Sequence, residues 1–138
     1  VNNAKPLWVV NKTLPYIKKL HKKNINIGCL GCTYKPNVDD IRESPSLEVI
    51  RQLKKVNHQT GFIDGYLFDK NINILLCDPH AKQNDIEFDL KNLEEVVNNS
   101  DIILCLVKHD EFLKIDFKKI VNSNTKVIDL CGLWNYRV

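Results

Sequence analysis

Cations and carboxylates alternate in the most polar stretch of the sequence, residues 32 to 43. Lys35 and Arg42 lie in this stretch, and Asp39 and Asp40 stand between them. A lysine ammonium binds phosphate oxygens as a point charge, whereas the planar guanidinium of arginine can grip a diphosphate through two parallel hydrogen bonds. We therefore expect this stretch to bind a small anionic ligand. A second interpretation stays open, in which the stretch is a solvated loop and Arg42 pairs with Asp39 or Asp40.

The residues that follow predict a helix whose start faces the same ligand. Ser44 is a good capping residue and Pro45 suits the first helical turn, while Glu48 lies near the positive end of the helix dipole. The free amides of that first turn would add hydrogen-bond donors for an anion.

Cysteine and histidine give weaker signals for chemistry. The five cysteines, Cys29, Cys32, Cys77, Cys105 and Cys131, lie mostly in or beside apolar runs, which favours reduced, buried thiols over a zinc or redox site. His80 and His109 each follow a predicted strand and could act as acid or base. A lone histidine at a strand end is more often solvated, so we expect no catalytic role for either.

Four apolar runs predict the strands that position these residues: 25 to 31, 72 to 78, 101 to 107 and 125 to 132. Helices are predicted near residues 7 to 20, with a kink or break at Pro15, then at 44 to 56, 90 to 100 and 117 to 121. The connector 57 to 71 contains FIDGYLF, which could be a short strand or a turn. Continuous apolar strands that alternate with helices are typical of a parallel sheet covered on both faces. The prediction is a Rossmann-like α/β three-layer sandwich, in which ligands bind at the carboxyl ends of the strands.

Several function classes fit the sequence poorly. After the first strand the chain reads Gly28-Cys29-Leu30-Gly31, without the G-x-G-x-x-G turn of dinucleotide-binding folds, and no P-loop pattern occurs. The net charge of +3 comes from scattered lysine pairs rather than a basic stripe, so we expect no nucleic-acid partner. No apolar run reaches the roughly 18 residues of a membrane span, and we expect no membrane partner and a cytoplasmic location.

The run GCTYKPNVDDIRESPSLEVI closely resembles the signature of the carboxy-terminal, UDP-binding domain of UDP-glucose/GDP-mannose dehydrogenases. CDPHA and VIDLCGLWNYR are similar to two strand ends of that domain, and VNNAKPLWVV is similar to the end of the family's long interdomain helix. On this resemblance we expect residues 1 to 23 to be the end of an interdomain, dimerising helix and residues 24 to 138 to be the UDP-sugar-binding domain. KPLWVV and GLWNYR are most similar to the branch whose substrate is UDP-N-acetyl-D-mannosamine.

The resemblance implies roles at three positions. Tyr34 and Lys35 correspond to the aromatic and lysine that contact the UDP-sugar, and Arg42 corresponds to the arginine that reaches toward NAD. Asp39, Asp40 and Glu43 are expected to shape the loop. Some members have a substrate-binding arginine after the last strand, but this chain reads Asp129-Leu130-Cys131-Gly132 there.

The family oxidises the C6 alcohol of the sugar to a carboxylate in two hydride transfers to NAD, through a cysteine thioester. The cysteine motif and the NAD-binding domain are absent from this sequence, so we expect an inactive part of a homodimeric enzyme, with no catalytic residue of its own. Leu7, Trp8 and residues 10 to 20 would then offer an exposed apolar face for self-association. Three alternatives stay open: a stand-alone nucleotide-sugar binding module, a dehydrogenase for UDP-glucose or UDP-N-acetylglucosamine, and an assembly domain.

Overall fold

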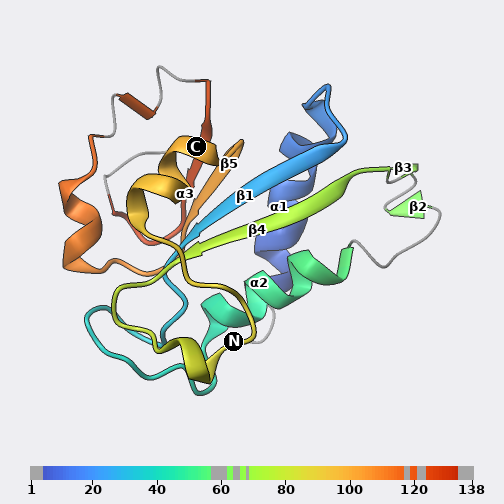
Figure 1. The fold of residues 1–138 in the computed structure, drawn as a ribbon. Helices are drawn as coiled ribbons and strands as arrows, with labels where there is room; N and C mark the ends of the chain where they lie inside the picture. Colours follow the sequence, from blue (N-terminus) through green and yellow to red (C-terminus); the bar gives the residue numbers. More distant parts are fainter. Residues whose placement is uncertain are drawn as a thin grey trace.

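A computed structural model describes residues 5–56, 62–63, 66–67, 69–116, 119–120 and 124–133. Its centre is a parallel sheet of four strands in the order β4-β1-β5-β6 (Figure 1). The strands are β1 (Asn24–Leu30), β4 (Asn71–Cys77), β5 (Ile102–Cys105) and β6 (Lys126–Asp129). All four strands were predicted, and the two short ones end before the apolar runs do.

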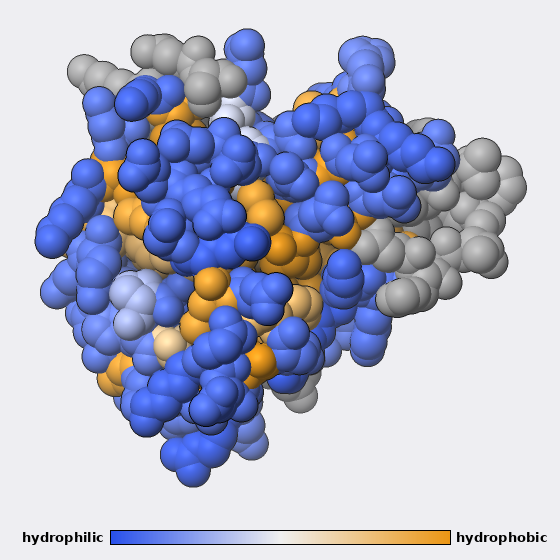
Figure 2. All heavy atoms as spheres, viewed as in Figure 1, coloured by the Kyte–Doolittle hydropathy of each residue, from blue (hydrophilic) through white to orange (hydrophobic). Residues whose placement is uncertain are grey.

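Both faces of the sheet are covered, which explains why the strands are almost continuously apolar. Along β5, Ile102 and Leu104 belong to one buried cluster, which also holds residues of α1 (Lys5–Lys19) and α2 (Pro45–Val56). Ile103 and Cys105 point into a second cluster with Val96 of α3 (Leu93–Asn99). The predicted three-layer α/β sandwich is confirmed. On the face seen in Figure 2, hydrophobic residues show mainly in the middle, surrounded by hydrophilic ones.

Helix α1 differs from its prediction in two ways. It runs through Pro15 without a break. Its apolar residues Val9, Val10, Leu14 and Ile17 are buried in the same cluster as α2. The expected exposed apolar face is therefore wrong for most of the helix, because α2 and the sheet cover it. Leu7 and Trp8, at 58% and 52% exposure, do remain on the surface.

The remaining elements are short. β2 (Phe62–Ile63) and β3 (Tyr66–Leu67) pair antiparallel, so the FIDGYLF stretch forms two short strands. Two 3-10 helices, η1 (Gln83–Asp85) and η2 (Asp110–Lys114), were not predicted. Of the helix predicted at 117 to 121, residues 119–120 are helical, and the rest lies outside the described residues. Residues 57 to 61, 64, 65 and 68 of the predicted 57 to 71 connector lie outside the described residues, as do residues 1 to 4 and the terminal WNYRV. Within the described part, no helix is long and apolar enough to cross a membrane.

Candidate functional site

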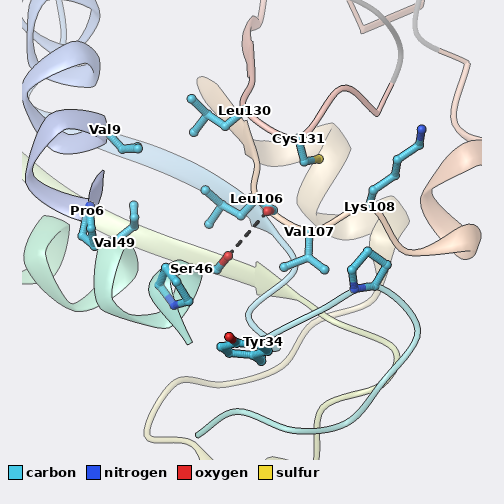
Figure 3. A pocket seen from close by; sticks show the side chains of 12 residues that line it. Pro6, Val9, Tyr34, Ser46, Val49, Leu106, Val107, Lys108, Leu130 and Cys131 are labelled. Atoms are coloured by element: carbon cyan, nitrogen blue, oxygen red, sulfur yellow. Dashed lines mark hydrogen bonds between the residues drawn. The ribbon is translucent and has the colours of Figure 1, made fainter. Parts of the chain in front are cut away.

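A pocket of about 420 Å³ opens at the carboxyl ends of β1, β5 and β6, beside the first turn of α2 (Figure 3). Parallel sheets bind ligands at this edge because the loops that leave the strands gather there. Most of the wall is apolar, and the polar groups come from the loop after β1, from α2 and from the segment after β5. The lining residues are Pro6, Val9, Tyr34, Pro36, Pro45, Ser46, Val49, Leu106, Val107, Lys108, Leu130 and Cys131.

The loop of residues 32–43, called loop 32–43 below, places Tyr34 in this pocket. The Tyr34 side chain is 46% exposed, and its backbone N–H donates to the Asp40 carbonyl at 2.6 Å, which closes the loop on itself. Lys35 is exposed and is not among the residues lining the pocket, although its neighbours Tyr34 and Pro36 are. The backbone carbonyl of Lys35 accepts a hydrogen bond from the Thr33 hydroxyl.

Arg42 does not line the pocket of Tyr34 and Pro36 but a separate hollow. It forms a bidentate pair with Asp40, with Nε–Oδ1 and Nη2–Oδ2 distances of 3.1 Å each. That hydrogen bonding lowers the pKa of the Asp40 carboxyl below its ordinary value. The pairing of Arg42 with Asp40 that composition suggested is therefore confirmed, and Asp39 instead contacts Lys82. The guanidinium side chain is still 87% exposed, so it can also reach a ligand.

The hollow of Arg42 adjoins the pocket of Tyr34. Ile41 lines the Arg42 hollow and also a neighbouring cleft to which Tyr34 and Pro45 contribute. Tyr34 and Pro45 in turn line the main pocket. Tyr34 and Arg42, predicted to contact substrate and cofactor, thus come from one loop and face hollows that a cleft connects, whereas Lys35 lies on the surface beside Tyr34.

Ser44 fixes α2 against the loop. Its hydroxyl accepts from the Leu47 N–H at 3.2 Å, as predicted for a helix cap, and donates to the Cys32 carbonyl at 2.7 Å. The second bond joins the start of α2 to the end of β1. Beside it, Ser46 faces the pocket and reaches the Leu106 carbonyl at 3.5 Å (Figure 3). A helix N-terminus in this position favours an anionic ligand through its free amides and its dipole.

A buried carboxylate lies beneath the loop. Asp78, directly after β4, accepts from the backbone N–H groups of Cys32 and Thr33, at 2.7 and 3.2 Å. It also accepts from His80 N–H at 2.8 Å. Burial alone would raise the pKa of Asp78, but the hydrogen bond to His109 and those from the Cys32 and His80 amides outweigh it and hold the pKa below its ordinary value.

His109 is fully buried against Asp78, with 3.0 Å between its Nε2 and an Asp78 carboxylate oxygen. The expectation of a solvated histidine is wrong here, because β4 supplies the partner and Phe112 of η2 packs on the ring. His80 is half-buried and bonds Glu111 at 3.0 Å. The sequence signal for His109 was its place after one strand together with an aspartate after another.

The cysteines offer no reactive thiolate in this site. Cys131 lines the pocket, but burial and the nearby Asp129 carboxylate raise the pKa of its thiol to about 12, so the thiol is protonated at neutral pH. Cys29, Cys32, Cys77 and Cys105 are buried, as predicted. Within the described ranges, no cluster of three or more His, Cys, Asp or Glu side chains could hold a metal ion.

Comparison with known proteins agrees with this geometry. The family model for the UDP binding domain of the UDP-glucose/GDP-mannose dehydrogenase family matches residues 28–136. The chain belongs to this family. The stretch that carries the match includes loop 32–43, the capped start of α2 and the Asp78 turn.

The sequence is similar to those of nucleotide-sugar dehydrogenases. A UDP-N-acetyl-D-mannosamine dehydrogenase from Methanocaldococcus jannaschii is 36% identical over 92% of this chain and 25% of its own length. An NDP-N-acetyl-D-galactosaminuronic acid dehydrogenase from Ralstonia solanacearum is 31% identical over 98% of this chain and 29% of its own. The chain thus spans between a quarter and a third of these relatives.

Among solved structures, a UDP-N-acetyl-mannosamine dehydrogenase from Staphylococcus aureus has the same fold. Its TM-score is 0.67 at 25% identity, with 98% of this chain and 29% of that one covered.

Proposed function

We propose that this chain is the UDP-sugar-binding part of an NAD-dependent UDP-N-acetyl-D-mannosamine 6-dehydrogenase. Such an enzyme oxidises the C6 alcohol of the sugar to a carboxylate, giving UDP-N-acetylmannosaminuronate for surface polysaccharide. The proposal is supported by the names of the relatives, both of which refer to N-acetylated sugars. The single observation that carries the binding role is the pocket at the strand ends, which Tyr34 lines beside the α2 N-terminus.

In this proposal Tyr34 stacks on or flanks the nucleotide, and Lys35 contacts its phosphates or ribose. Tyr34 supports the first role because about half of its side chain is exposed at the pocket wall. Lys35 supports the second because it is exposed next to that wall and a lysine stem is long enough to reach over it. Lys108 is the positively charged residue among those that line the pocket. It could supply the cation that other members place after the last strand.

NAD would be bound mainly by a domain outside this chain, with Arg42 as the contribution from this side. Arg42 would offer NAD one exposed guanidinium, which already forms hydrogen bonds to Asp40. Its planar fork keeps further N–H donors for a phosphate or a carboxylate. The cofactor supplies the hydride acceptor of the oxidation.

The assembly and location of the parent protein belong to the same proposal. We assign residues 1 to 23, which include α1, to the end of an interdomain segment that joins two copies of the enzyme, and residues 24 to 138 to the UDP-sugar-binding domain. A cytoplasmic location and the lack of nucleic-acid or membrane partners stay predictions from the sequence.

Calorimetric titration of this chain with UDP tests the binding role. We expect Lys35→Ala to weaken UDP binding about tenfold, because a charge-assisted hydrogen bond to phosphate is lost. Lys54→Ala is the matched control, since Lys54 is an exposed lysine on the last turn of α2, away from the pocket. Binding that is equal in Lys35→Ala and Lys54→Ala, with both variants folded, would remove Lys35 from the site. Absence of UDP binding by the unmodified chain would count against the function itself.

A further inference from the structure

The buried side chains of Asp78 and His109 connect the ends of three strands beneath loop 32–43. Asp78 follows β4 and accepts from Cys32 and Thr33 N–H groups, which follow β1. His109 follows β5 and bonds the same carboxylate. Both side chains have no solvent-exposed surface. One carboxylate therefore ties together the places where β1, β4 and β5 end.

His109 also holds the middle of loop 32–43 from the other side of its ring. The Asn37 backbone N–H donates to Nδ1 of His109 at 2.9 Å. In turn the Asn37 side-chain oxygen accepts from the Asp110 N–H at 3.0 Å. Asn37 has a φ of 62°, in the left-handed region, where asparagine is one of the few side chains that fit easily. The loop is thus pinned to the β5 end at this position.

Tyr34 and Lys35 lie between these two anchors. Before them, Thr33 is held by Asp78, and after them Asn37 is held by His109. The Thr33 hydroxyl additionally donates to the Lys35 carbonyl at 3.0 Å. With both ends of this five-residue span fixed, the backbone of Tyr34 and Lys35 has little freedom.

The contacts at the two ring nitrogens of His109 require one form of the ring. Because Nδ1 accepts from the Asn37 N–H, Nδ1 carries a lone pair, and the single proton of a neutral imidazole is on Nε2. That Nε2–H points at the Asp78 carboxylate and the Thr33 hydroxyl, at 3.0 and 3.2 Å. Asp78 therefore selects the tautomer that can hold the loop, in the way that a carboxylate orients a metal-ligating histidine.

We propose that His109 is a positioning residue for nucleotide binding, which holds loop 32–43 through Nδ1 in the shape that presents Tyr34 and Lys35 to the ligand. This role rests on the proposed UDP-binding function. His109 would then affect the affinity for the nucleotide through its hydrogen bond to the loop, and not only the packing of the core.

Two substitutions distinguish the role of Nδ1 from that of Nε2. Asparagine at position 109 can place an amide oxygen near the former Nδ1, so His109→Asn keeps an acceptor for Asn37. Glutamine reaches nearer to the former Nε2, so His109→Gln keeps a donor for Asp78 and leaves the Asn37 N–H unpaired. We expect His109→Gln to weaken UDP binding about tenfold and His109→Asn to stay within about threefold of the unmodified chain.

The control is His80→Asn, because the His80 ring lies 4.6 Å from that of His109 but its side chain bonds Glu111 rather than the loop. We expect UDP binding to be unchanged in this variant. Equal affinities of His109→Gln and the unmodified chain would overturn the positioning role, and so would an equal loss in both His109 variants. If the unmodified chain itself binds no UDP, the proposed function fails, which is a different outcome.

A measurement on the unmodified chain tests the geometry even if a variant does not fold. Nitrogen NMR shifts of His109 should show a proton on Nε2 and a bare Nδ1 at neutral pH, and the Asn37 amide should exchange with solvent far more slowly than in an unstructured peptide. A protonated Nδ1, or an Asn37 amide that exchanges at the unstructured rate, would overturn the proposal without any ligand.

Discussion

Lys108 brings a positive charge to the wall of the pocket. It follows β5 and lines the pocket beside Cys131 (Figure 3). Its charge acts on the Cys131 thiol, where it partly opposes the rise in pKa. Pro45 and Ser46 of the α2 N-terminus line the same pocket, so a diphosphate bound there would be attracted by both a cation and a helix N-terminus.

We expect Lys108→Ala to weaken UDP binding by about tenfold, because a charge-assisted contact to phosphate is lost. The dependence of affinity on salt should also become shallower, since screening acts on one charge fewer. Calorimetry at two ionic strengths measures both effects. Lys114→Ala is the control, as Lys114 is exposed on η2 and lines a different hollow. A loss of the same size in both variants would mean that only net charge matters.

Asp78 links stability to pH in a direction that follows from its lowered pKa. A carboxylate whose pKa is lower in the folded state stabilises the protein above its ordinary pKa of 3.8, and this contribution is lost as the pH falls through the folded value. We therefore expect the free energy of unfolding to fall below about pH 4.

Asp78→Asn isolates this contribution from those of other carboxylates. At pH 7 we expect it to lower the free energy of unfolding by about 3 kcal/mol, because the partners of a buried charge are left unpaired. The difference from the unmodified chain should shrink as the pH approaches 3. Urea unfolding across pH 3 to 7 measures this, and a constant difference would show that Asp78 does not titrate as proposed.

Residue roles were predictable where a motif fixes them and not where burial does. Ser44 as a cap followed from its place before Pro45, and the structure confirms it. His109 was misjudged because its partner comes from another strand, 31 positions earlier in the chain. Local sequence shows what a side chain can do but not which distant group will face it.

At the scale of elements, the turn after β1 depends on a glycine. Gly31 has a φ of 99°, and its N–H donates to the Cys77 carbonyl at 2.9 Å. A Cβ on Gly31 would lie 2.5 Å from the Val107 Cβ and 2.9 Å from its backbone nitrogen. No side chain fits there without moving the segment that follows β5, which lines the pocket.

Gly31→Ala should therefore lower the free energy of unfolding more than Gly132→Ala, in which the backbone strain is similar. Gly132 has a φ of 74°, but nothing lies within 4 Å of a Cβ there. We expect Gly132→Ala to lower the free energy of unfolding by about 1 kcal/mol through backbone strain alone. Gly31→Ala should lower it by roughly 3 kcal/mol, because overpacking adds to the strain. Urea unfolding compares the two, and equal losses would refute the close approach of Val107.

The strands of the parallel sheet and the α-helices were predictable from the sequence, but their neighbours in space were not. Apolar runs located all four sheet strands, because a strand buried on both faces must be apolar throughout. The neighbours of each strand were not predictable from those runs, since β1 pairs with β4 and β5 through backbone groups that every residue has. Helix α1 shows the same limit: its periodicity indicated an apolar face, but not that α2 would cover it.

For the whole molecule, the residues at the start of α1 bear on self-association. Leu7 and Trp8 are 58% and 52% exposed, next to residues that are buried. The Lys12 ammonium lies over the Trp8 ring at 4.8 Å from its centroid, so one face of the ring is partly shielded. Two large apolar side chains exposed side by side favour contact with another surface.

If copies of the enzyme meet through this helix, as we propose, replacing both residues should weaken the contact. We expect the Leu7→Ser, Trp8→Ser double variant to sediment as single copies at concentrations where the unmodified chain self-associates. The variant has less apolar surface to remove from water when two copies meet. Leu113→Ser is the matched control, since Leu113 is 50% exposed on η2, in a different part of the fold. Sedimentation velocity over a concentration series measures the outcome. The proposed role of α1 in self-association would be contradicted if the unmodified chain stayed monomeric throughout, or if the control variant dissociated equally.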